Sequence, residues 1–401
     1  MKILFITDNF PPEVNAPANR TFEHCREWVK EGNEVTVITC FPNFPKGKVY
    51  DGYKNKWKKV EIIEGIKVIR VWSFITPNEG LIKRTIDYIS FSITSFIAGL
   101  FVKTDLIIAT SPQFFTALSG RWLSFFKKRP WVFEVRDIWP ESIIAVGAMK
   151  RNFLIKIFEL LEIRMYKNAS KIIVVTDSFK ENIISKKINK NKIFVHKNGA
   201  NLDLYKPIEK NLELVKELKI EGKIVFAYIG THGMAHGLDF IFRSLKKIEH
   251  NNPNIHFLFI GDGAEKTNLT QLKKKLELNN VTMLPSVSKK EVVKYLSLMD
   301  YALVNLRKSD TFKNVIPSKI FEAAAMEKPI LLGLEGETKK IIELYGCGEC
   351  FEPENEFDLI NKINKIIQNN HQNNYINGCR KMNIDFDRKK IALNMLKDLK
   401  K

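Results

Sequence analysis

The chain has 401 residues, of which 45% are hydrophobic and 27% charged, so it can bury a large core and is not a disordered protein. This length favours two domains over one. Its 64 basic and 45 acidic residues give a formal net charge of +19. Such a charge suits a protein that meets nucleic acid or an anionic bilayer, with a generally lysine-rich soluble protein as the alternative.

The cysteine and hydrophobic patterns exclude further classes. Five scattered cysteines are too few for a disulfide scaffold and indicate a reducing compartment. The longest apolar stretch, residues 88–102, is shorter than the roughly 18 residues that a membrane-spanning helix needs. The apolar run at residues 3–6 is far shorter than the core of a signal peptide. We therefore expect neither a secreted protein nor a polytopic membrane protein.

The first half alternates β-branched runs with segments of helix length. The expected strands are residues 3–7, 34–39, 67–72, 105–110, 131–136 and 171–176. The expected helices include residues 19–30, 112–126 and 151–167. This alternation predicts a parallel, doubly wound sheet. Residues 1–200 are also the more basic half, with 32 basic and 19 acidic residues and all six tryptophans.

The pattern restarts after a polar stretch at residues 201–222. The expected strands are residues 224–229, 256–260, 281–284, 301–304 and 329–332, and a helix is expected over residues 238–250. The chain therefore reads as two α/β domains in series, followed by a helical segment at residues 377–401. Ligands of open parallel sheets bind beyond the carboxyl ends of the strands, so the residues that follow each strand are the candidates.

A loop of small residues follows the first strand, between residues 8 and 20. Asn15 and Ala16 stand where backbone N–H groups and the dipole of the next helix can hold an anion, and Arg20 lies one turn further along. The loop lacks the glycines of a dinucleotide-binding motif. It indicates either contact with a phosphate or a proline-stiffened loop that only caps the helix.

A glycine-rich turn joins the strand at residues 224–229 to its helix. It runs from Gly230 to Gly237, and such a strand–turn–helix unit is typical of phosphate binding. His232 and His236 are four residues apart, as in some zinc sites. No glutamate stands between them and the segment is a turn rather than a helix, so an anion is expected here and a metal is not.

A third candidate is the helix that begins near Pro317. Its first turn holds Ser318 and Lys319, and Glu322 lies three residues after Lys319 on nearly the same face. A lysine at a helix N-terminus opposes the helix dipole, so an anion is expected beside it. The carboxylate suits the hydroxyls of a ribose. The alternative is an exposed ion pair worth about 0.2–0.5 kcal/mol.

A fourth candidate follows the strand at residues 131–136. Arg136 can pair with a phosphate and Asp137 can act as a general base, with a structural ion pair as the alternative. Two further matches are set aside. Cys347 and Cys350 form a lone CxxC without a second ligand pair, and the DxD at residues 385–387 lies in a polar connection rather than after a core strand. No metal site is expected.

In this order, the motifs resemble those of the retaining GT-B glycosyltransferases of family four. The subgroup that they resemble is the WbuB type, the L-fucosamine transferases of O-antigen and capsule assembly. The likeness covers nearly the whole chain. It rests on residues 8–20, 40–48, 136–142, 198–207, 260–263 and 317–322.

The resemblance implies a GT-B fold, in which two Rossmann-like domains face each other across a cleft. Residues 1–200 would bind the acceptor and meet the membrane. Residues 201–376 would bind the nucleotide sugar, and residues 377–401 would return to the first domain as a helix. Glu322 would hold the ribose hydroxyls, and the backbone at Ser286 and Val287 would meet the base. Gly261 and Asp262 match the end of a strand in the family's second domain.

The chain departs from the family in the diphosphate turn. The family usually carries an arginine directly after Gly230 and a lysine directly before the last glycine of the turn, whereas this chain has Thr231 and His236. We therefore predict that Lys319, helped by His236 and Arg20, supplies the positive charge.

Two further positions depart from the family. The family's sugar-contacting acid is replaced by Asn314, and the Gly-Gly of its first loop by Ala16-Pro17.

The activity that the resemblance implies is transfer of an N-acetylated amino or deoxyamino sugar from a UDP-sugar, with retention of configuration. The acceptor would be a polyprenyl-diphosphate-linked saccharide in bacterial surface polysaccharide synthesis. The leaving phosphate would take the acceptor proton, with Asp137 as second choice, and neither a cofactor nor a metal is expected. The protein would lie on the cytoplasmic face of the cell membrane, held by residues 88–102 and 125–129, unless residues 88–102 pack in the core.

Two rival functions remain at this stage. One is a nucleotide-sugar epimerase of the same architecture, which would form product without an acceptor. The other is a nucleic-acid binder that uses the charge of +19, although no RNP, helix-turn-helix or zinc pattern is present. We expect the nucleotide-sugar donor, the lipid-linked acceptor and the anionic membrane surface to be the partners, and nucleic acid not to be one.

Overall fold

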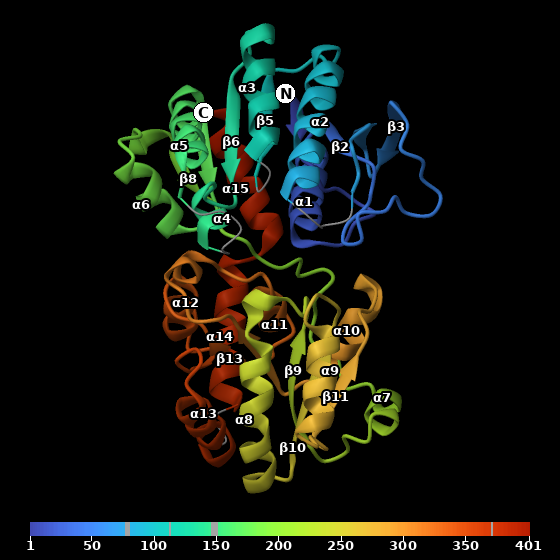
Figure 1. Cartoon of the computed structure of the whole chain (residues 1–401), viewed down its shortest axis with the longest axis vertical. Coiled ribbons are helices and arrows are strands. Elements are labelled where there is room, and N and C mark those ends of the chain that lie inside the picture. The colour runs from blue at the N-terminus through green and yellow to red at the C-terminus, as the bar shows by residue number, and fades with distance from the viewer. Residues whose placement is uncertain (77–80, 112–113, 146–150, 370–371) are drawn as a thin grey trace. The chain divides into compact units, whose positions relative to one another are not determined.

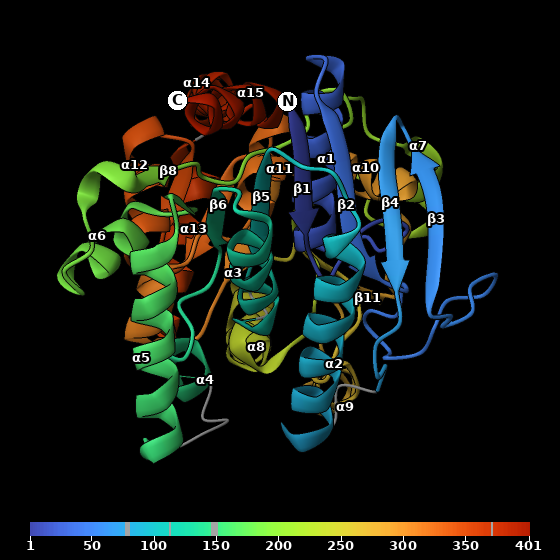
Figure 2. The same cartoon turned by 90° about the horizontal axis from the view of Figure 1, so that it is seen from above.

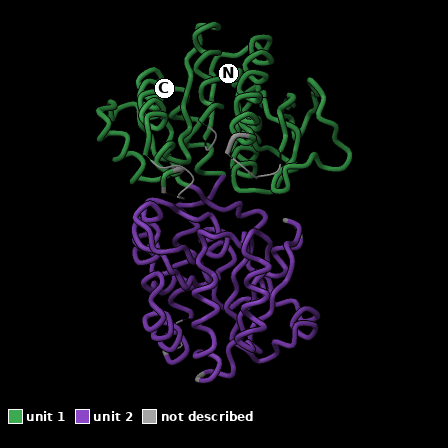
Figure 3. The backbone as a smooth tube through the Cα atoms, viewed as in Figure 1, with its two compact units in different colours: residues 1–197, 389–401 green, residues 198–388 purple. Residues whose placement is uncertain are grey.

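A computed structural model of the chain describes residues 1–76, 81–111, 114–145, 151–369 and 372–401. The chain divides into two compact units (Figure 3). Unit 1 consists of residues 1–197 and 389–401, and unit 2 of residues 198–388. The chain therefore passes twice between the units, the first time close to the expected boundary at residue 200.

Unit 1 is built on an eight-stranded sheet in the order β3-β4-β2-β1-β5-β6-β7-β8. Only β3 is antiparallel to its neighbour. Strand β5 is fully buried and consists of LIIAT, as expected for a central parallel strand covered on both faces. The strands are β1 (Lys2–Ile6), β2 (Glu34–Cys40), β3 (Lys58–Ile63), β4 (Ile66–Val71), β5 (Leu106–Thr110), β6 (Trp131–Val135), β7 (Lys171–Val174) and β8 (Ile193–Val195).

Helices cover both faces of this sheet (Figures 1 and 2). One face carries α2, α3 and α5, whose residues share a core with β5 and β6. The other face carries α1 and the last helix, α15, which pack together against β1. The helices are α1 (Ala16–Lys30), α2 (Leu81–Leu100), α3 (Phe114–Lys127), α4 (Glu141–Ala145), α5 (Phe153–Asn168), α6 (Asp177–Ser185), η1 (Lys190–Lys192) and α15 (Arg388–Lys400).

Unit 2 is built on a six-stranded parallel sheet in the order β11-β10-β9-β12-β13-β14. Its strands are β9 (Ile224–Ile229), β10 (Ile255–Ile260), β11 (Val281–Leu284), β12 (Tyr301–Asn305), β13 (Ile330–Gly333) and β14 (Gly348–Cys350). Its helices are α7 (Leu212–Glu217), η2 (Met234–His236), α8 (Leu238–Asn251), α9 (Lys266–Lys275), α10 (Lys289–Leu298), η3 (Asp310–Asn314), α11 (Lys319–Ala325), α12 (Glu337–Tyr345), α13 (Glu356–Asn369) and α14 (Gln372–Asp385).

The expected single helix at residues 377–401 is wrong, because two helices of different units occupy this stretch. Helix α14 ends at Asp385, and Asp387 then forms a β-bridge with Ala200. The backbone N–H of Ala200 donates to the carbonyl of Phe386, and the N–H of Arg388 donates to the carbonyl of Ala200. These long-range hydrogen bonds replace the helical ones and end α14. Only α15 returns to unit 1.

Local capping explains where several helices begin. The Asn15 side chain accepts from the N–H of Ala18, and Pro17 stands in the first turn of α1, where its missing N–H costs nothing. Ser288 and Glu291 form a complete capping box at the start of α10. The helix starts are thus decided by residues next to them in sequence.

Candidate functional site

The carboxyl ends of three neighbouring strands in unit 2 bring the glycine-rich turn and the Lys319 helix together. Gly230 follows β9, Gly261 follows β10 and Asn305 ends β12. The N–H of Gly230 donates to the carbonyl of Ile260 at 2.9 Å. Because these strands are parallel, the segments that follow them meet at one edge of the sheet, where ligands of such sheets bind.

Two glycines allow the turn to close. Gly261 has a φ of +151°, and a Cβ there would collide with the carbonyl oxygen of Gly230. Gly237 has a φ of +57° and stands 3.2 Å from the side chains of Asn305 and Arg307, measured from an ideal Cβ. Only glycine suits a positive φ in such close packing, so the two strand ends approach each other through backbone alone.

Hydrogen bonds from β9, from β12 and from the residues after β12 hold the turn in place. The amide of Asn305 donates to the carbonyl of His236 at 2.7 Å, and the Arg307 guanidinium donates to the carbonyl of Met234 at 2.8 Å. The Tyr228 hydroxyl donates to the carbonyl of Thr231 at 2.7 Å. The turn is therefore a rigid structure in this protein.

The side chain of Lys319 enters this turn. Its Nζ lies 3.7 Å from the centroid of the Tyr228 ring and 3.0 Å from the position that a Cβ on Gly230 would take. The Nζ is buried and has no hydrogen-bond partner among the described residues. Burial lowers the pKa of Lys319 from 10.5 to about 7, against the opposing effect of Glu322. The turn therefore holds an amine whose charge is not compensated by a hydrogen-bonded acceptor.

Two histidines beside Lys319 also have ring nitrogens without hydrogen-bond partners among the described residues. His232 is fully buried, and within the described part of the chain neither of its ring nitrogens has a hydrogen-bond partner; the same holds for Nδ1 of His236. Burial lowers the pKa of each from 6.5 to about 4, helped by Lys266 and Lys319 at His232 and by Lys319 at His236. Buried polar atoms normally have partners, so this group points to a ligand.

The prediction that His236 helps Lys319 with positive charge stays a prediction, because a diphosphate in the turn would raise the pKa of both groups. With a pKa of about 4 its ring is neutral at pH 7, because burial and the nearby ammonium both oppose protonation. A neutral ring can still donate one hydrogen bond to a phosphate oxygen. While its ring is neutral, His236 can therefore act as a hydrogen-bonding group beside Lys319.

The remaining candidates of unit 2 follow neighbouring strands, Asp262 after β10 and Ser286 and Val287 after β11. Asp262 is exposed, and its carboxylate accepts from the N–H of Gly263 at 2.8 Å. Ser286 is exposed and Val287 is half-buried in the segment after β11. Their role in binding a base, like that of Glu322 in holding a ribose, stays a prediction.

Ser318 and Asn314 stand near the start of α11. Ser318 occupies the N-cap position of α11 without a side-chain capping bond, and Asn314 is exposed at the end of η3. Helix α11 has only seven residues, so its dipole is small and the side chain of Lys319 matters more than the helix end. Because Asn314 is exposed, the position that contacts the sugar in the family is accessible to a ligand here.

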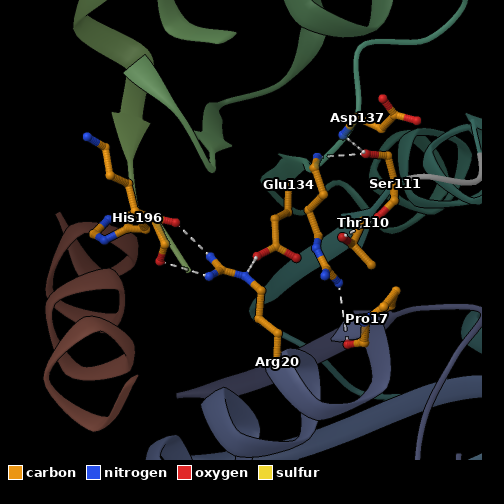
Figure 4. A network of polar contacts seen from close by, with 9 residues as sticks. Pro17, Arg20, Thr110, Ser111, Glu134, Asp137 and His196 are labelled. Carbon is orange, nitrogen blue, oxygen red and sulfur yellow. Dashed lines mark hydrogen bonds and ion pairs between the residues drawn. The ribbon is translucent and has the colours of Figure 1, made fainter. Parts of the chain in front are cut away.

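Arg20 does not lie where the sequence predicted it. Its guanidinium is buried in unit 1, 3.1 Å from the carboxylate of Glu134, and it donates to the backbone carbonyls of His196 at 2.9 Å and Lys197 at 3.1 Å (Figure 4). Arg20 and Arg136 hold the pKa of Glu134 below its usual range despite burial. The predicted phosphate contact of Arg20 is therefore wrong, because its guanidinium is committed to this network.

Arg136 contacts the start of α1, and Asp137 lies beside Ser111. The Arg136 guanidinium donates to the carbonyl of Pro17 at 3.3 Å, and the Ser111 hydroxyl accepts from the backbone N–H groups of Arg136 at 2.7 Å and Asp137 at 3.2 Å (Figure 4). Burial raises the pKa of Asp137, against a hydrogen bond from Ser142. Asn15 uses its side-chain oxygen to cap α1, so any anion here would meet the backbone around Ala16.

The sequence reasoning missed Tyr228 and His232 as members of the site. Tyr228 looks like an ordinary strand residue, and only the fold shows that its ring supports Lys319. For His232 the sequence did offer a signal, because this residue stands inside the glycine-rich turn that was expected to bind an anion. The described residues contain no cluster of three or more His, Cys, Asp or Glu that could hold a metal ion, and all five cysteines are free thiols.

Comparison with known proteins agrees with this architecture. The chain is similar to HepE of Anabaena, solved in complex with UDP and glucose, with a TM-score of 0.73 and 18% identity over 100% of this chain and 99% of that one. The two sheets, parallel except for β3, and this likeness define a GT-B fold with two Rossmann-like domains, which confirms the expected fold class.

The family models cover both units. Residues 18–204 match the model described as Glycosyltransferase Family 4, and residues 209–382 match the one described as Glycosyl transferases group 1. Together these two matches support a GT-B glycosyltransferase of family 4.

Two curated relatives are named for polysaccharide synthesis. WcaI of Escherichia coli (strain K12), named as a colanic acid biosynthesis glycosyl transferase, is 23% identical over 92% of this chain and 92% of its own length. TuaH of Bacillus subtilis (strain 168), named as a teichuronic acid biosynthesis glycosyltransferase, is 25% identical over 61% of this chain and 60% of its own length. These likenesses support a glycosyltransferase role.

Proposed function

We propose that the chain transfers an N-acetylated amino or deoxyamino sugar from a UDP-sugar to a polyprenyl-diphosphate-linked saccharide, with retention of anomeric configuration. The reaction would belong to O-antigen or capsule synthesis, in the WbuB-like subgroup. The UDP complex of HepE and the name of WcaI support the donor and the pathway class. The observation that carries the proposal is the buried Lys319 amine at the glycine-rich turn, without a hydrogen-bonded partner among the described residues.

The diphosphate of the donor suits this turn. Lys319 would neutralise the negative charge that grows on the leaving phosphate, and neutral His232 and His236 would each donate a hydrogen bond. Groups placed in advance around a developing oxyanion contribute more than groups that must reorganise, and the rigid turn provides that placement. Glu322, three residues after Lys319 on α11, would accept from the ribose hydroxyls.

The transfer step is a substitution at the anomeric carbon. The bond from this carbon to the phosphate oxygen breaks, and the phosphate keeps the electron pair. The acceptor hydroxyl oxygen bonds to the same face of an oxocarbenium-like sugar, and its proton passes to the leaving phosphate. Asp137 is the second choice of base. Burial raises its pKa, so its carboxylate takes up a proton more readily than an exposed carboxylate does.

The membrane surface would be the face of unit 1 formed by α2 and α3. Helix α2 uses Phe91 and Ala98 for the core, while Ile89, Ile93 and Ile97 on its other side are 36–47% exposed. One side of the helix thus packs in the core, as one alternative for residues 88–102 expects, and the exposed other side is available for the proposed membrane contact. Among the described residues, no helix is both long and apolar enough to cross a bilayer.

Basic residues flank this apolar face at both ends of the helices. Lys83 and Arg84 are exposed in the first turn of α2, and Lys128 and Arg129 are exposed just after α3. Apolar side chains bordered by cations are typical of segments that lie in the plane of an anionic membrane. We therefore place the protein peripherally on the inner face of the cell membrane.

Transfer assays with a panel of UDP-sugars and a lipid-linked acceptor test the activity. Lys319→Ala is expected to lower kcat about 100-fold or more, while Lys328→Ala, at another largely buried lysine of unit 2, leaves it near normal. NMR of the product reports whether the donor's anomeric configuration is kept. Near-normal turnover of Lys319→Ala, or an inverted product, would contradict the proposal.

Vesicle binding tests the membrane face separately. The double variant Ile89→Gln/Ile93→Gln is expected to lose binding to vesicles that contain phosphatidylglycerol. Its control is Ile62→Gln, which replaces an isoleucine that is 67% exposed on the edge strand β3. Equal vesicle binding by the double variant and the control would show that the α2 side is not the membrane surface.

A further inference from the structure

A pocket of about 550 Å³ opens at the edge of unit 1 where its parallel strands begin. Four cations line it: Lys2 at the start of β1, Lys103 before β5, Lys127 at the end of α3 and Arg129 before β6. The loops that precede α1 and follow β6 lie at the carboxyl ends of the strands, at the opposite edge of the sheet. The pocket is therefore separate from the residues considered for acceptor binding.

The positive charge of the pocket is mostly uncompensated. In the described part of the chain neither Lys103 nor Arg129 has an ion pair or a side-chain hydrogen bond. The Lys127 amine donates to the carbonyl of Leu100 at 2.9 Å, which holds it at the rim of the pocket without neutralising it. The Lys2 amine is 3.4 Å from Glu34. The pocket's one lining carboxylate, on Asp105, accepts from the backbone N–H of Lys2 at 2.7 Å.

Apolar side chains join this pocket to the α2 and α3 face. Leu100 and Phe126 line it, and Phe126 is 64% exposed while its neighbour Phe125 is 73% exposed. The Phe126 ring lies 5.5 Å from that of Phe96 on α2, centroid to centroid, so the two helices meet here. Phe101, directly after α2, is 80% exposed. A ligand held by the cations would have exposed aromatic rings beside it.

We propose that this pocket binds the phosphate of an anionic lipid headgroup, with the acyl chains of that lipid against Phe125, Phe126 and the α2 face. The cations select a phosphate, and the continuous apolar surface selects a lipid over a soluble anion. The proposal rests on the membrane attachment proposed above and adds to it a specific lipid site. The pocket would fix which part of unit 1 meets the bilayer surface.

The test compares two double variants of equal net charge. Lys103→Gln/Arg129→Gln removes two cations of the pocket. Lys54→Gln/Lys56→Gln removes two exposed lysines from the opposite edge of the sheet, because β3 starts beside the end of β4. Binding is measured by flotation with phosphatidylcholine vesicles with and without phosphatidylglycerol. We expect about 25-fold weaker binding of the pocket variant to anionic vesicles, at about fivefold per cation, and little change in the control.

Each outcome decides the proposal. Equal losses in both variants would mean that only overall charge matters, and no loss in either would mean that the pocket is not used; both overturn the lipid site. Soluble glycerophosphate serves as competitor, and displacement from vesicles at the same phosphate concentration would assign the pocket to a soluble anion instead.

The same experiment separates this inference from the membrane proposal. If the pocket variant binds like wild type while Ile89→Gln/Ile93→Gln does not bind, only the lipid site is wrong. If both bind like wild type, the membrane face is wrong as well. Because all these substitutions lie in unit 1, the circular dichroism spectrum and the thermal unfolding midpoint of each variant are compared with wild type to show that unit 1 is folded.

Discussion

Replacing Lys319 by methionine removes the amine and keeps most of the side-chain length, so it separates charge from packing. Burial lowers the pKa of Lys319 from 10.5 to about 7. At about 1.4 kcal/mol per pH unit, holding this amine costs about 4 kcal/mol of unfolding free energy at pH 7. The contact with the Tyr228 ring offsets up to about 2 kcal/mol. We expect Lys319→Met to raise the unfolding free energy by about 2–4 kcal/mol while activity is lost.

The pH dependence of stability checks the cause. The folded-state pKa lies below the unfolded-state value, so the unfolded chain holds this proton more tightly. The unfolding free energy of the wild type therefore rises between pH 7 and 10.5 through this group. Urea unfolding at pH 7 and pH 9 measures the rise. In Lys319→Met the unfolding free energy is expected to rise less between pH 7 and pH 9, by the amount that Lys319 contributes in the wild type.

Binding of UDP provides the matching test. Phosphates beside Lys319 would return its pKa toward the ordinary range, so binding above pH 7 takes up a proton. The Kd of the wild type is then expected to rise about tenfold per pH unit above pH 7. Calorimetry in buffers of different ionisation enthalpy measures both the Kd and the proton uptake.

A second buried lysine serves as control for this test. Burial also lowers the pKa of Lys328, but its amine donates to the carbonyl of Ser297 at 3.1 Å instead of entering the turn. Lys328→Met should keep the wild-type dependence of UDP binding on pH. Lys319→Met and wild type are compared for the pH dependence of the unfolding free energy and of the Kd for UDP. If both dependences are the same, the reasoning that Lys319 titrates near pH 7 is refuted.

Three further predictions concern the two units separately. Glu322→Ala is expected to weaken UDP about 10- to 100-fold through lost hydrogen bonds to a charged group while leaving pyrophosphate binding unchanged; unchanged UDP affinity in calorimetry would contradict the ribose role. Arg20→Met should cost about 3–5 kcal/mol of unfolding free energy because it strands the buried Glu134, and Glu134→Gln should recover part of it. Weaker UDP binding without lost stability would instead restore a phosphate role for Arg20. The depressed pKa values of His232 and His236 mean that their stabilisation is lost as pH falls from 6.5 toward 4, by at most about 3 kcal/mol each. A His232→Gln variant should show a smaller loss in acid unfolding, and an identical loss would argue against the buried neutral ring.

The positions of the site segments were predictable because they depend on local patterns. The apolar strand β9, its glycine turn and the following helix appear in the sequence as one unit, as do Pro317 and the helix that carries Lys319. Parallel strands end at one edge of their sheet, so these segments had to lie near each other. The partners of each side chain were not predictable in the same way.

Arg20 and His236 show what pattern reasoning cannot decide. Arg20 stands in the right turn of α1 for a phosphate, but its partners Glu134 and His196 are more than a hundred residues away in sequence. His236 carries a titratable ring, but only the packing of the turn and the position of Lys319 set its pKa. Long-range contacts and burial decide both cases, and neither quantity is visible in a local window.

The sequence by itself determined the fold class, the order of the elements and the segments that form the site, because hydrophobic period, glycines and caps act over a few neighbouring residues. Only the tertiary structure decided that the Lys319 amine lies against the Tyr228 ring, that helix α2 is core on one side and exposed on the other, and that four separate cations form one pocket. These features arise from residues brought together across the chain, where desolvation and packing fix what each group can do.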